Sequence, residues 1–265
     1  MADANHSTQR EKERSVDAPS QGRIAERALE TVLSPSTGPM RILWSHMHVS
    51  PQEEAFEMAP KIAIVFYSMY GHIRKMAEAE KEGIEKAGGT ADIYQVPETL
   101  PKEVLEKMHA PGQSADIPIL SDPGTLEAYD GILFGIPTRY GNFPAQMKAF
   151  IDHTGKQWQT GGFWGKMAGL FVSTASQGGG QESTAIAAMS TFAHHGFIYV
   201  PLGYARSFAN LVDLSEVRGG SAWGAGTFAG PDGSRQPSEK ELELARIQGA
   251  EFYKTVAKYT GSPQP

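Results

Sequence analysis

Residues suited to holding a phosphate follow the first apolar run of the chain. The segment Lys61–Ile73 reads KIAIVFYSMYGHI, and its apolar run passes directly into Ser68, Tyr70, Gly71 and His72. A helical pattern of apolar residues then begins. A turn between a buried strand and a helix gathers unpaired backbone N–H groups, and the helix dipole adds positive potential there. The turn therefore predicts a phosphate site, and the alternative is an ordinary strand–helix turn that binds nothing.

Two further stretches combine hydroxyl, glycine and aromatic groups after an apolar run. They are Pro137–Asn142, PTRYGN, and Ser173–Gly180, STASQGGG. In a parallel sheet, the loops after these strands and after the first one open at the same edge. No G-x-G-x-x-G and no Walker lysine follow the first strand, which argues against a dinucleotide fingerprint and a P-loop. The three loops predict a mononucleotide with an aromatic ring system, its phosphate on the first loop.

Alternating strands and helices must position these loops. The sequence predicts strands at 61–67, 91–96, 131–136, 166–174 and 197–200, and helices at 72–87, 102–109, 143–152 and 181–194. A last helix begins at Pro237-Ser238, where Ser238 and Glu241 form a capping-box pair. This alternation predicts an α/β fold, a doubly wound five-stranded parallel sheet with helices on both faces. Its expected strand order is the flavodoxin-like 2-1-3-4-5.

Composition excludes several classes of function. The 265-residue chain carries a formal net charge of −6, which argues against nucleic-acid binding. Cysteine is absent, so disulfides and thiol chemistry are excluded and any redox chemistry needs a cofactor. No apolar run approaches the roughly 20 residues that span a bilayer. We expect a cytoplasmic protein without a membrane span, and peripheral membrane association stays open.

The first 57 residues differ from the rest of the chain. They are polar, mix acidic and basic residues, and contain a Pro/Ser run at 34–39. Such a segment buries too little apolar surface to offset chain entropy, so we expect a disordered or poorly ordered extension. Acidic residues argue against organelle import, among them Asp3, Glu11, Glu13, Asp17, Glu26 and Glu30. An over-extended gene model with Met58 as the natural start is an alternative. The flavodoxin-like domain is expected at 58–261 and a tail at 262–265.

The motifs of the three loops resemble those of the WrbA family of FMN-dependent NAD(P)H:quinone oxidoreductases. The matching stretches are YSMYGH (67–72), PTRYGN (137–142), GGGQE (178–182), AHHG (193–196) and the run at 217–238. The run at 58–72 is typical of fungal members. The resemblance implies FMN as cofactor, NADH or NADPH as electron donor, and two-electron ping-pong reduction of quinones to hydroquinones. It also implies a homotetramer and a role in oxidative stress.

The same resemblance assigns residues to roles. The first loop would hold the FMN phosphate and ribityl chain, and the other two loops would hold the isoalloxazine. The implied FMN-binding residues are Ser68, Met69, Tyr70, Gly71, His72, Ile73, Pro137, Thr138, Arg139, Tyr140, Gly141, Asn142, Ser173, Thr174, Ala175, Ser176, Gln177, Gly178, Gly179 and His194. Tyr70 would also touch the nicotinamide nucleotide, and Trp158 the substrate. The implied catalytic residues are Arg139, which would stabilise negative charge on the reduced flavin, and His194, which would come from a neighbouring subunit.

Each of these roles has a structural alternative. His194 and His195 are adjacent on a helix and point about 100° apart, so they cannot share a metal, and no metal site is expected. We expect His194 to be functional and His195 to pack or hydrogen-bond, and the alternative is that both are structural. Trp158 could be an interface or core aromatic, and Arg139 could anchor a carboxylate across a subunit boundary.

Two other functions stay open for a flavin-binding chain of this kind. One is a flavodoxin-like carrier that passes single electrons to a protein partner. The other is a flavoprotein scaffold in which reductase activity is incidental.

Overall fold

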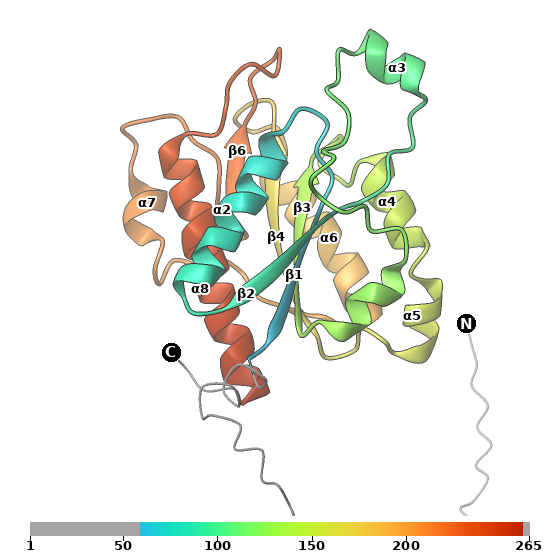
Figure 1. Ribbon diagram of the computed structural model, residues 1–265. Helices are drawn as coiled ribbons and strands as arrows, with labels where there is room; N and C mark the ends of the chain where they lie inside the picture. The colour runs from blue at the N-terminus through green and yellow to red at the C-terminus, as the bar shows by residue number, and fades with distance from the viewer. Residues whose placement is uncertain (1–58, 262–265) are drawn as a thin grey trace, which may run out of the picture. The chain divides into compact units, whose positions relative to one another are not determined.

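A parallel β-sheet forms the centre of the molecule (Figure 1). The computed structural model describes residues 59–261, and the predicted extension and tail lie outside the described residues. The strands β1 (Lys61–Phe66), β2 (Thr90–Gln95), β3 (Gly131–Pro137), β4 (Met167–Thr174) and β5 (Ile198–Tyr199) follow the order β2-β1-β3-β4-β5, with every pair parallel. This order confirms the flavodoxin-like fold.

A sixth strand, β6 (Gly226–Phe228), was not predicted from the sequence. It pairs in parallel with Val172–Thr174 at the end of β4, while β5 pairs only with the start of β4 at Met167 and Ala168. Three residues after a glycine-rich stretch carry no periodic signal, so sequence reasoning had nothing to detect. The edge of β4 is therefore shared by two short strands, and β6 lies beside the third loop.

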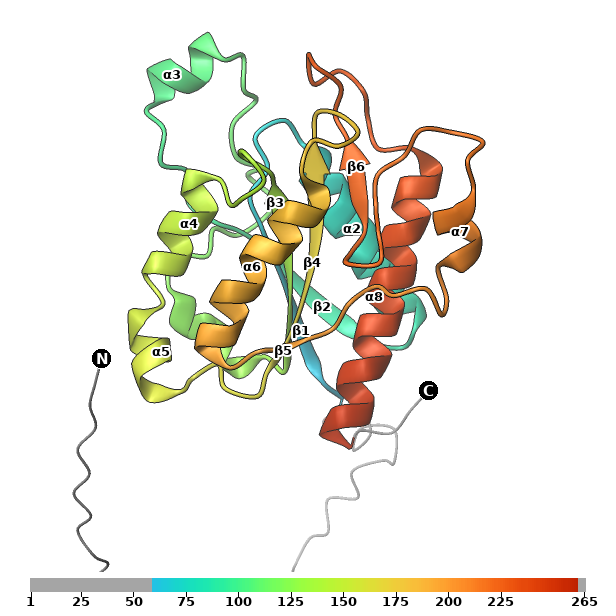
Figure 2. The ribbon, with the colours of Figure 1, turned by 180° about the vertical axis from the view of Figure 1, so that it is seen from behind.

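Helices cover both faces of the sheet (Figures 1 and 2). The helical elements are α2 (His72–Lys86), α3 (Lys102–Lys107), the 3-10 helix η1 (Pro123–Ala128), α4 (Ala145–Asp152), α5 (Gly155–Thr160), α6 (Gln181–His195), α7 (Phe208–Val212) and α8 (Glu239–Thr260). Helices α2 and α8 pack with one buried cluster, which includes Ile62, Ile64 and Phe66 of β1. Helices α4 and α6 pack with the other, which includes Ala63 and Val65. This alternation along β1 is that of a strand buried on both faces.

Helix α2, whose first turn carries the first loop, is held by a close crossing with α8. At this crossing a Cβ on Gly83 would collide with the backbone of Arg246, and one on Gly249 with the backbone of Glu80. Glycine at both positions therefore lets the two backbones meet. The predicted capping box at the start of α8 is present, because Ser238 Oγ accepts from the N–H of Glu241 and Ser238 N–H donates to Glu241 Oε2 over 2.8 Å.

The buried face of α2 includes an acid without a partner. Glu80 is fully buried, and neither carboxylate oxygen has a hydrogen-bond partner among the described residues. Burial raises the pKa of Glu80 well above its ordinary value, so burial favours the protonated form of this side chain.

Replacing Glu80 should change how stability depends on pH. A group whose pKa is raised by folding contributes to the free energy of unfolding. That contribution is fully present below the unfolded pKa of about 4.3 and is lost as pH rises from there through the folded-state pKa. We expect Glu80→Gln to gain stability relative to the wild type as pH rises from 5 to 8, with a difference of about 1–3 kcal/mol at pH 8. Urea unfolding at both pH values measures this, with the exposed Glu85→Gln as control. Parallel pH profiles for Glu80→Gln and the wild type would contradict the prediction.

Candidate functional site

Three loops meet above the carboxyl ends of β1, β3 and β4. The second and third are in direct contact, since Thr138 N–H donates to Ser173 O over 2.9 Å and the hydroxyls of Thr138 and Thr184 lie 2.7 Å apart. A Cβ on Gly180 would lie only 3.0 Å from the Cα of Gly141. The convergence expected from the strand order is therefore present.

The first loop leaves backbone donors free at the start of α2. Ser68 Oγ accepts from the N–H groups of Gly71 over 3.1 Å and Arg74 over 3.4 Å. The next N–H groups, those of His72 and Ile73, have no acceptor within residues 59–261. Free N–H groups at the N-terminus of a 15-residue helix suit an anion, so the residues present fit a phosphate.

Tyr70 connects the first loop to a neighbouring segment. Its ring is 42% exposed, and its hydroxyl donates to the carbonyl oxygen of Met108 over 3.1 Å. Met108 follows α3, on the excursion between β2 and η1 that extends beyond the sheet edge in Figure 1. The aromatic ring is therefore accessible from solvent while its hydroxyl is held.

The second loop is a tight turn that presents an aromatic ring. Arg139 and Asn142 exchange both backbone hydrogen bonds, over 2.9 and 3.0 Å. The two residues between them, Tyr140 at φ 56° and Gly141 at φ 73°, both have positive φ, as a type I′ turn requires. A tyrosine rarely takes this conformation, and here its side chain is fully exposed. Such strain at an exposed aromatic fits a ring-binding surface better than a plain surface turn.

Arg139 presents a free charge at this edge. Its guanidinium donates only to the neighbouring carbonyl of Thr138, over 2.8 Å, and within residues 59–261 it pairs with no carboxylate. Burial raises the pKa of the Tyr67 phenol and Glu98 raises it further, whereas Arg139 opposes the shift, so its charge lies near the end of β1. An unpaired cation here can stabilise negative charge on a bound molecule.

A carboxylate behind the loops, Glu98, was missed from the sequence. Its Oε2 accepts from the hydroxyl of Tyr67 and its Oε1 from the side-chain amide of Gln146, each over 2.7 Å. The N–H groups of Thr99 and Leu100 also donate to Oε1. Partial burial opposes ionisation, but these donors hold the pKa of Glu98 below its ordinary value. The carboxylate thus ties the end of β1, just before the first loop, to α4, just after the second.

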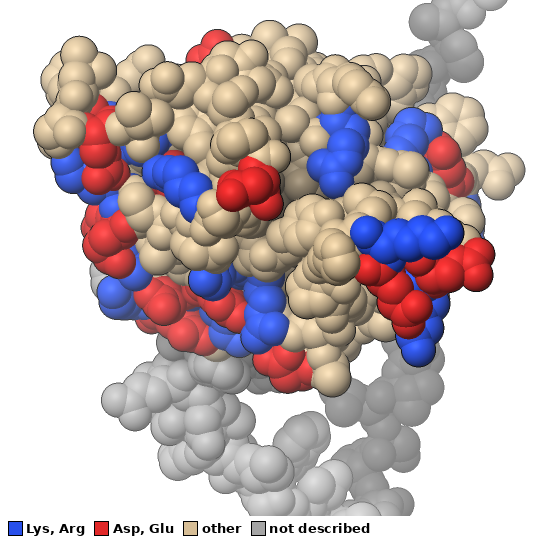
Figure 3. Space-filling model, turned by 90° about the horizontal axis from the view of Figure 1, so that it is seen from above, with Lys and Arg blue, Asp and Glu red and all other residues tan. Residues whose placement is uncertain are grey.

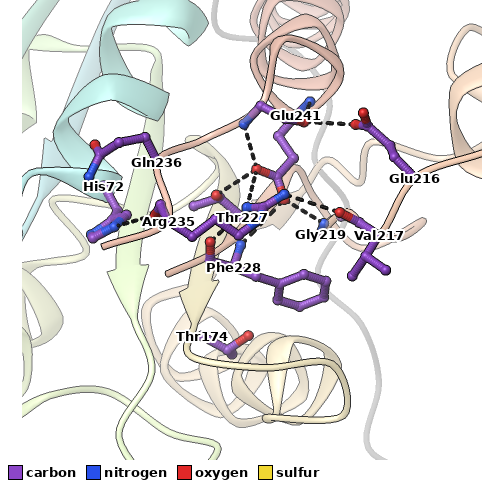
Figure 4. A network of polar contacts seen from close by, with 12 residues as sticks. His72, Thr174, Glu216, Val217, Gly219, Thr227, Phe228, Arg235, Gln236 and Glu241 are labelled. Carbon is purple, nitrogen blue, oxygen red and sulfur yellow. Dashed lines mark hydrogen bonds and ion pairs between the residues drawn. The ribbon is translucent and has the colours of Figure 1, made fainter. Parts of the chain in front are cut away.

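A second carboxylate, Glu241, lies at the centre of the polar network in Figure 4. It is fully buried, and its oxygens accept from the Thr227 hydroxyl (2.7 Å), Arg235 Nη1 (2.9 Å) and the N–H groups of Ser238 and Gly219 (2.8 Å each). From the sequence, Glu241 was predicted only as the partner of Ser238 in the capping box. Its contacts with Thr227 and Gly219 were not predicted, because these residues lie 14 and 22 positions away along the chain.

The third loop is exposed but anchored at its base. Ser173 and Thr174, predicted both as the end of the fourth strand and as part of the loop, are the buried last residues of β4, where they pair with β6. The exposed part of the loop begins at Ala175, whose carbonyl accepts from Gly230 N–H over 2.9 Å. Behind it, the amide of Gln181 bridges Thr227 O and, through its oxygen, Gly220 N–H. The loop therefore keeps exposed backbone N–H groups on a fixed base.

Two predicted residues, Trp158 and His194, do not join the loops. Helix α6 starts at the third loop and runs 15 residues, so at about 1.5 Å per residue His194 ends up roughly 20 Å away. Trp158 lies on α5 at that same far end (Figures 1 and 2), and its side chain is 61% exposed. Neither side chain can reach a ligand held by the three loops of its own chain.

The neighbouring His195 is built into the core. Its Nε2 lies 2.8 Å from Thr154 Oγ1, and its ring packs against Phe163 with centroids 5.2 Å apart. Burial, with a smaller contribution from His194, lowers the pKa of His195. The packing and hydrogen-bonding role expected for this residue is therefore the one it has.

The surface above the loops is mostly uncharged. Figure 3 looks down on this edge, where an acidic and a basic side chain border a hollow and most of the remaining surface is uncharged. Residues 59–261 include no group of three metal-ligating side chains close enough to hold a metal ion. In the same range, no helix has both the length and the apolar character needed to cross a membrane.

Comparison with known proteins gives a consistent assignment. A profile described as NADPH-dependent FMN reductase matches residues 60–210. The chain is 67% identical over 201 residues to the minor allergen Alt a 7 of Alternaria alternata, with 76% of this chain and 98% of the relative covered. It is 60% identical over 201 residues to the NAD(P)H quinone oxidoreductase PST3 of Candida albicans, covering 76% of this chain and all of the relative.

Among solved structures, a flavodoxin, WrbA-like protein from Agrobacterium tumefaciens matches the fold. The TM-score is 0.52 at 23% identity, with 76% of this chain and 99% of that chain covered. The chain therefore belongs to the NADPH-dependent FMN reductase family and has a flavodoxin-like fold, and its matched relatives include fungal proteins.

Proposed function

We propose that this protein is an FMN-dependent NAD(P)H:quinone oxidoreductase that reduces quinones to hydroquinones by two-electron, ping-pong transfer. The observation that carries the proposal is the convergence of the three loops, with free N–H groups at His72 and Ile73 on one side and the Tyr140 turn on the other. Relatives at 54–60% identity from Candida albicans are named NAD(P)H quinone oxidoreductases, which supports the choice of substrate.

The residues present divide the work of binding and charge stabilisation. The N–H groups of His72 and Ile73 would hold the phosphate, and the Tyr140 turn and the exposed third loop would hold the ring system. Bound FMN supplies the chemistry, accepting a hydride from NADH or NADPH and passing two electrons to the quinone. The unpaired guanidinium of Arg139 would stabilise the negative charge that reduction brings to this edge. Tyr70, exposed beside the first loop, is the expected contact of the nicotinamide nucleotide.

A neighbouring copy would complete the site. His194 lies roughly 20 Å from the loops of its own chain and Trp158 lies at the same far end, so they would reach a bound flavin only if another subunit presented them. Both lie on exposed surface at one end of the molecule, near the exposed Trp164. This supports a symmetric oligomer such as the homotetramer implied by the family resemblance, because in such an assembly one end of a subunit can contact a different part of the next subunit. A cytoplasmic location stays a prediction from the sequence.

Anaerobic titration of the purified protein tests the reaction. Addition of NADH or NADPH should bleach the flavin absorbance without any partner reductase, and benzoquinone should restore it in equal amount. Because the donor leaves before the quinone binds, initial rates with NADH and benzoquinone should give parallel double-reciprocal lines. Intersecting lines would rule out the ping-pong order, and a flavin that NAD(P)H cannot reduce directly would favour the one-electron carrier.

Removing the free charge of Arg139 should make the flavin harder to reduce. We expect Arg139→Gln to lower the midpoint potential of bound FMN by roughly 30 mV, equivalent to about 1.4 kcal/mol for a two-electron couple. Redox titration against a dye of known potential measures the shift. Lys148→Gln, on the exposed side of α4, removes the same charge away from the loops and serves as the control. Equal potentials in Arg139→Gln and the wild type would exclude the role.

Subunit mixing tests whether His194 and Trp158 act on a neighbour. His194→Ala and Trp158→Ala should each lower quinone turnover, by about tenfold where a hydrogen bond to the reacting groups is lost, while FMN stays bound. Co-expression of His194→Ala with an Arg139→Gln chain should restore part of the activity, since some sites then combine two intact residues from different chains. Oligomers that contain only His194→Ala chains, or only Arg139→Gln chains, are the control. Mixed oligomers no more active than either parent, or a monomeric active enzyme, would contradict the arrangement.

A further inference from the structure

The side chain of His72 is oriented by a residue far away in the sequence. His72 is the first residue of α2, its side chain is buried, and its Nε2 lies 2.8 Å from the carbonyl oxygen of Arg235. A carbonyl oxygen can only accept, so Nε2 carries the hydrogen and donates it. Nδ1 is left without a partner among the described residues. The backbone N–H of His72 is one of the two free donors of the first loop, so the hydrogen bond to Arg235 holds a residue on which the predicted phosphate position depends.

The carbonyl of Arg235 is held in place by its own side chain. The guanidinium donates through Nη1 to Phe228 O over 2.7 Å and to Glu241 Oε2 over 2.9 Å, and through Nη2 to Val217 O over 3.1 Å. The backbone N–H of Arg235 also donates to Ala229 O over 3.0 Å. A planar guanidinium with three fixed acceptors leaves the residue little freedom to rotate or shift.

Glu241 holds the Arg235 guanidinium in place. The carboxylate is fully buried, whereas the side chain of Arg235 is 32% exposed, and Figure 4 shows the two facing each other at the start of α8. Further donors to Glu241 include the Thr227 hydroxyl and the N–H groups of Ser238 and Gly219, which come from three different segments. A buried charge held by so many donors tolerates little displacement, because each lost donor leaves it less compensated.

The segment 229–235 joins two of the three loops. At one end the N–H groups of Ala229 and Gly230 donate to Thr174 O and Ala175 O, over 2.8 and 2.9 Å, at the base of the third loop. At the other end the carbonyl of Arg235 accepts from His72 in the first loop. The spacing between these two loops is therefore set through one short segment whose far end is fixed by the Arg235–Glu241 pair.

We propose that Arg235 is a positioning residue for recognition of the cofactor phosphate, acting through His72. Together with Glu241 it fixes the carbonyl that orients the His72 imidazole at the start of α2. The proposal rests on the proposed phosphate-binding role of the first loop. Arg235 acts without touching the cofactor, so its loss should affect the phosphate end of the ligand and spare the ring system.

Binding of FMN and riboflavin to the full-length protein, stripped of flavin, separates these effects. Riboflavin lacks the phosphate and otherwise matches FMN. We expect Arg235→Ala to weaken FMN binding by about tenfold, as for a lost hydrogen bond to a charged group, and to leave riboflavin binding within about twofold. Quenching of flavin fluorescence measures both dissociation constants. Lys240→Ala is the matched control, because Lys240 is a cation at the start of α8, the helix that carries Glu241. Lys240 pairs with Asp213, and no hydrogen bond or ion pair among the described residues joins it to segment 229–235.

A double-mutant cycle tests the route through His72. His72→Ala should weaken FMN binding by itself, and adding Arg235→Ala should then cause no further loss, because the two residues act as one unit. If Arg235→Ala fails to fold, Arg235→Lys keeps a charge beside Glu241, loses the three-acceptor geometry, and allows the same comparison.

The outcomes separate the proposal from its premise. Equal loss of FMN and riboflavin affinity, full additivity with His72→Ala, or an unchanged preference for FMN in Arg235→Ala would each overturn the positioning role alone. A wild-type protein that binds riboflavin as tightly as FMN would overturn the phosphate role of the first loop, and the positioning role with it.

Discussion

The buried carboxylate of Glu241 is the constraint on which the C-terminal third of the fold depends. Its donors lie before β6, within β6, in segment 229–235 and at the first turn of α8. Removing one partner of such a buried ionic network typically costs about 3–5 kcal/mol, so these four segments must be in place together. The pairing of β6 with β4 and the start of α8 are therefore coupled through one side chain, although neither contacts a ligand in the proposed site.

Two carboxylates divide the task of setting the loops. Glu98 joins the end of β1 to α4 and so relates the first loop to the second. Glu241 acts through Arg235 and segment 229–235, and so relates the first loop to the third. The loops make few hydrogen bonds of their own, which leaves backbone donors free for a ligand. Their precision must come from these groups behind them, as expected for a binding site whose first contacts are preorganised by a supporting layer.

The sequence was sufficient for what local patterns encode and insufficient for what distant contacts decide. Apolar runs predicted the buried strands, because a strand buried on both faces leaves that signature, and the alternation of strands with helices predicted their order. The three loops were recognisable because each follows such a run. Strand β6 was missed, since its three paired residues carry no periodic pattern, whereas the end of the fourth strand at Thr174 was predicted. The Arg235–His72 contact joins residues 163 positions apart, and no local pattern could reveal it.

The position of His194 and Trp158 adds a further constraint on the proposed function. One chain carries the three loops at one end of the sheet and these two side chains at the other, so in the proposed function a single copy would hold parts of two different sites. A complete site then requires the far end of one subunit to lie over the loops of the next. Mutations that disturb this contact would reduce turnover without touching a flavin ligand, since the missing groups belong to the neighbouring chain. In the proposed function, the assembly of subunits would therefore contribute to the active site, as the hydrogen bonds to Glu241 contribute to the position of the loops.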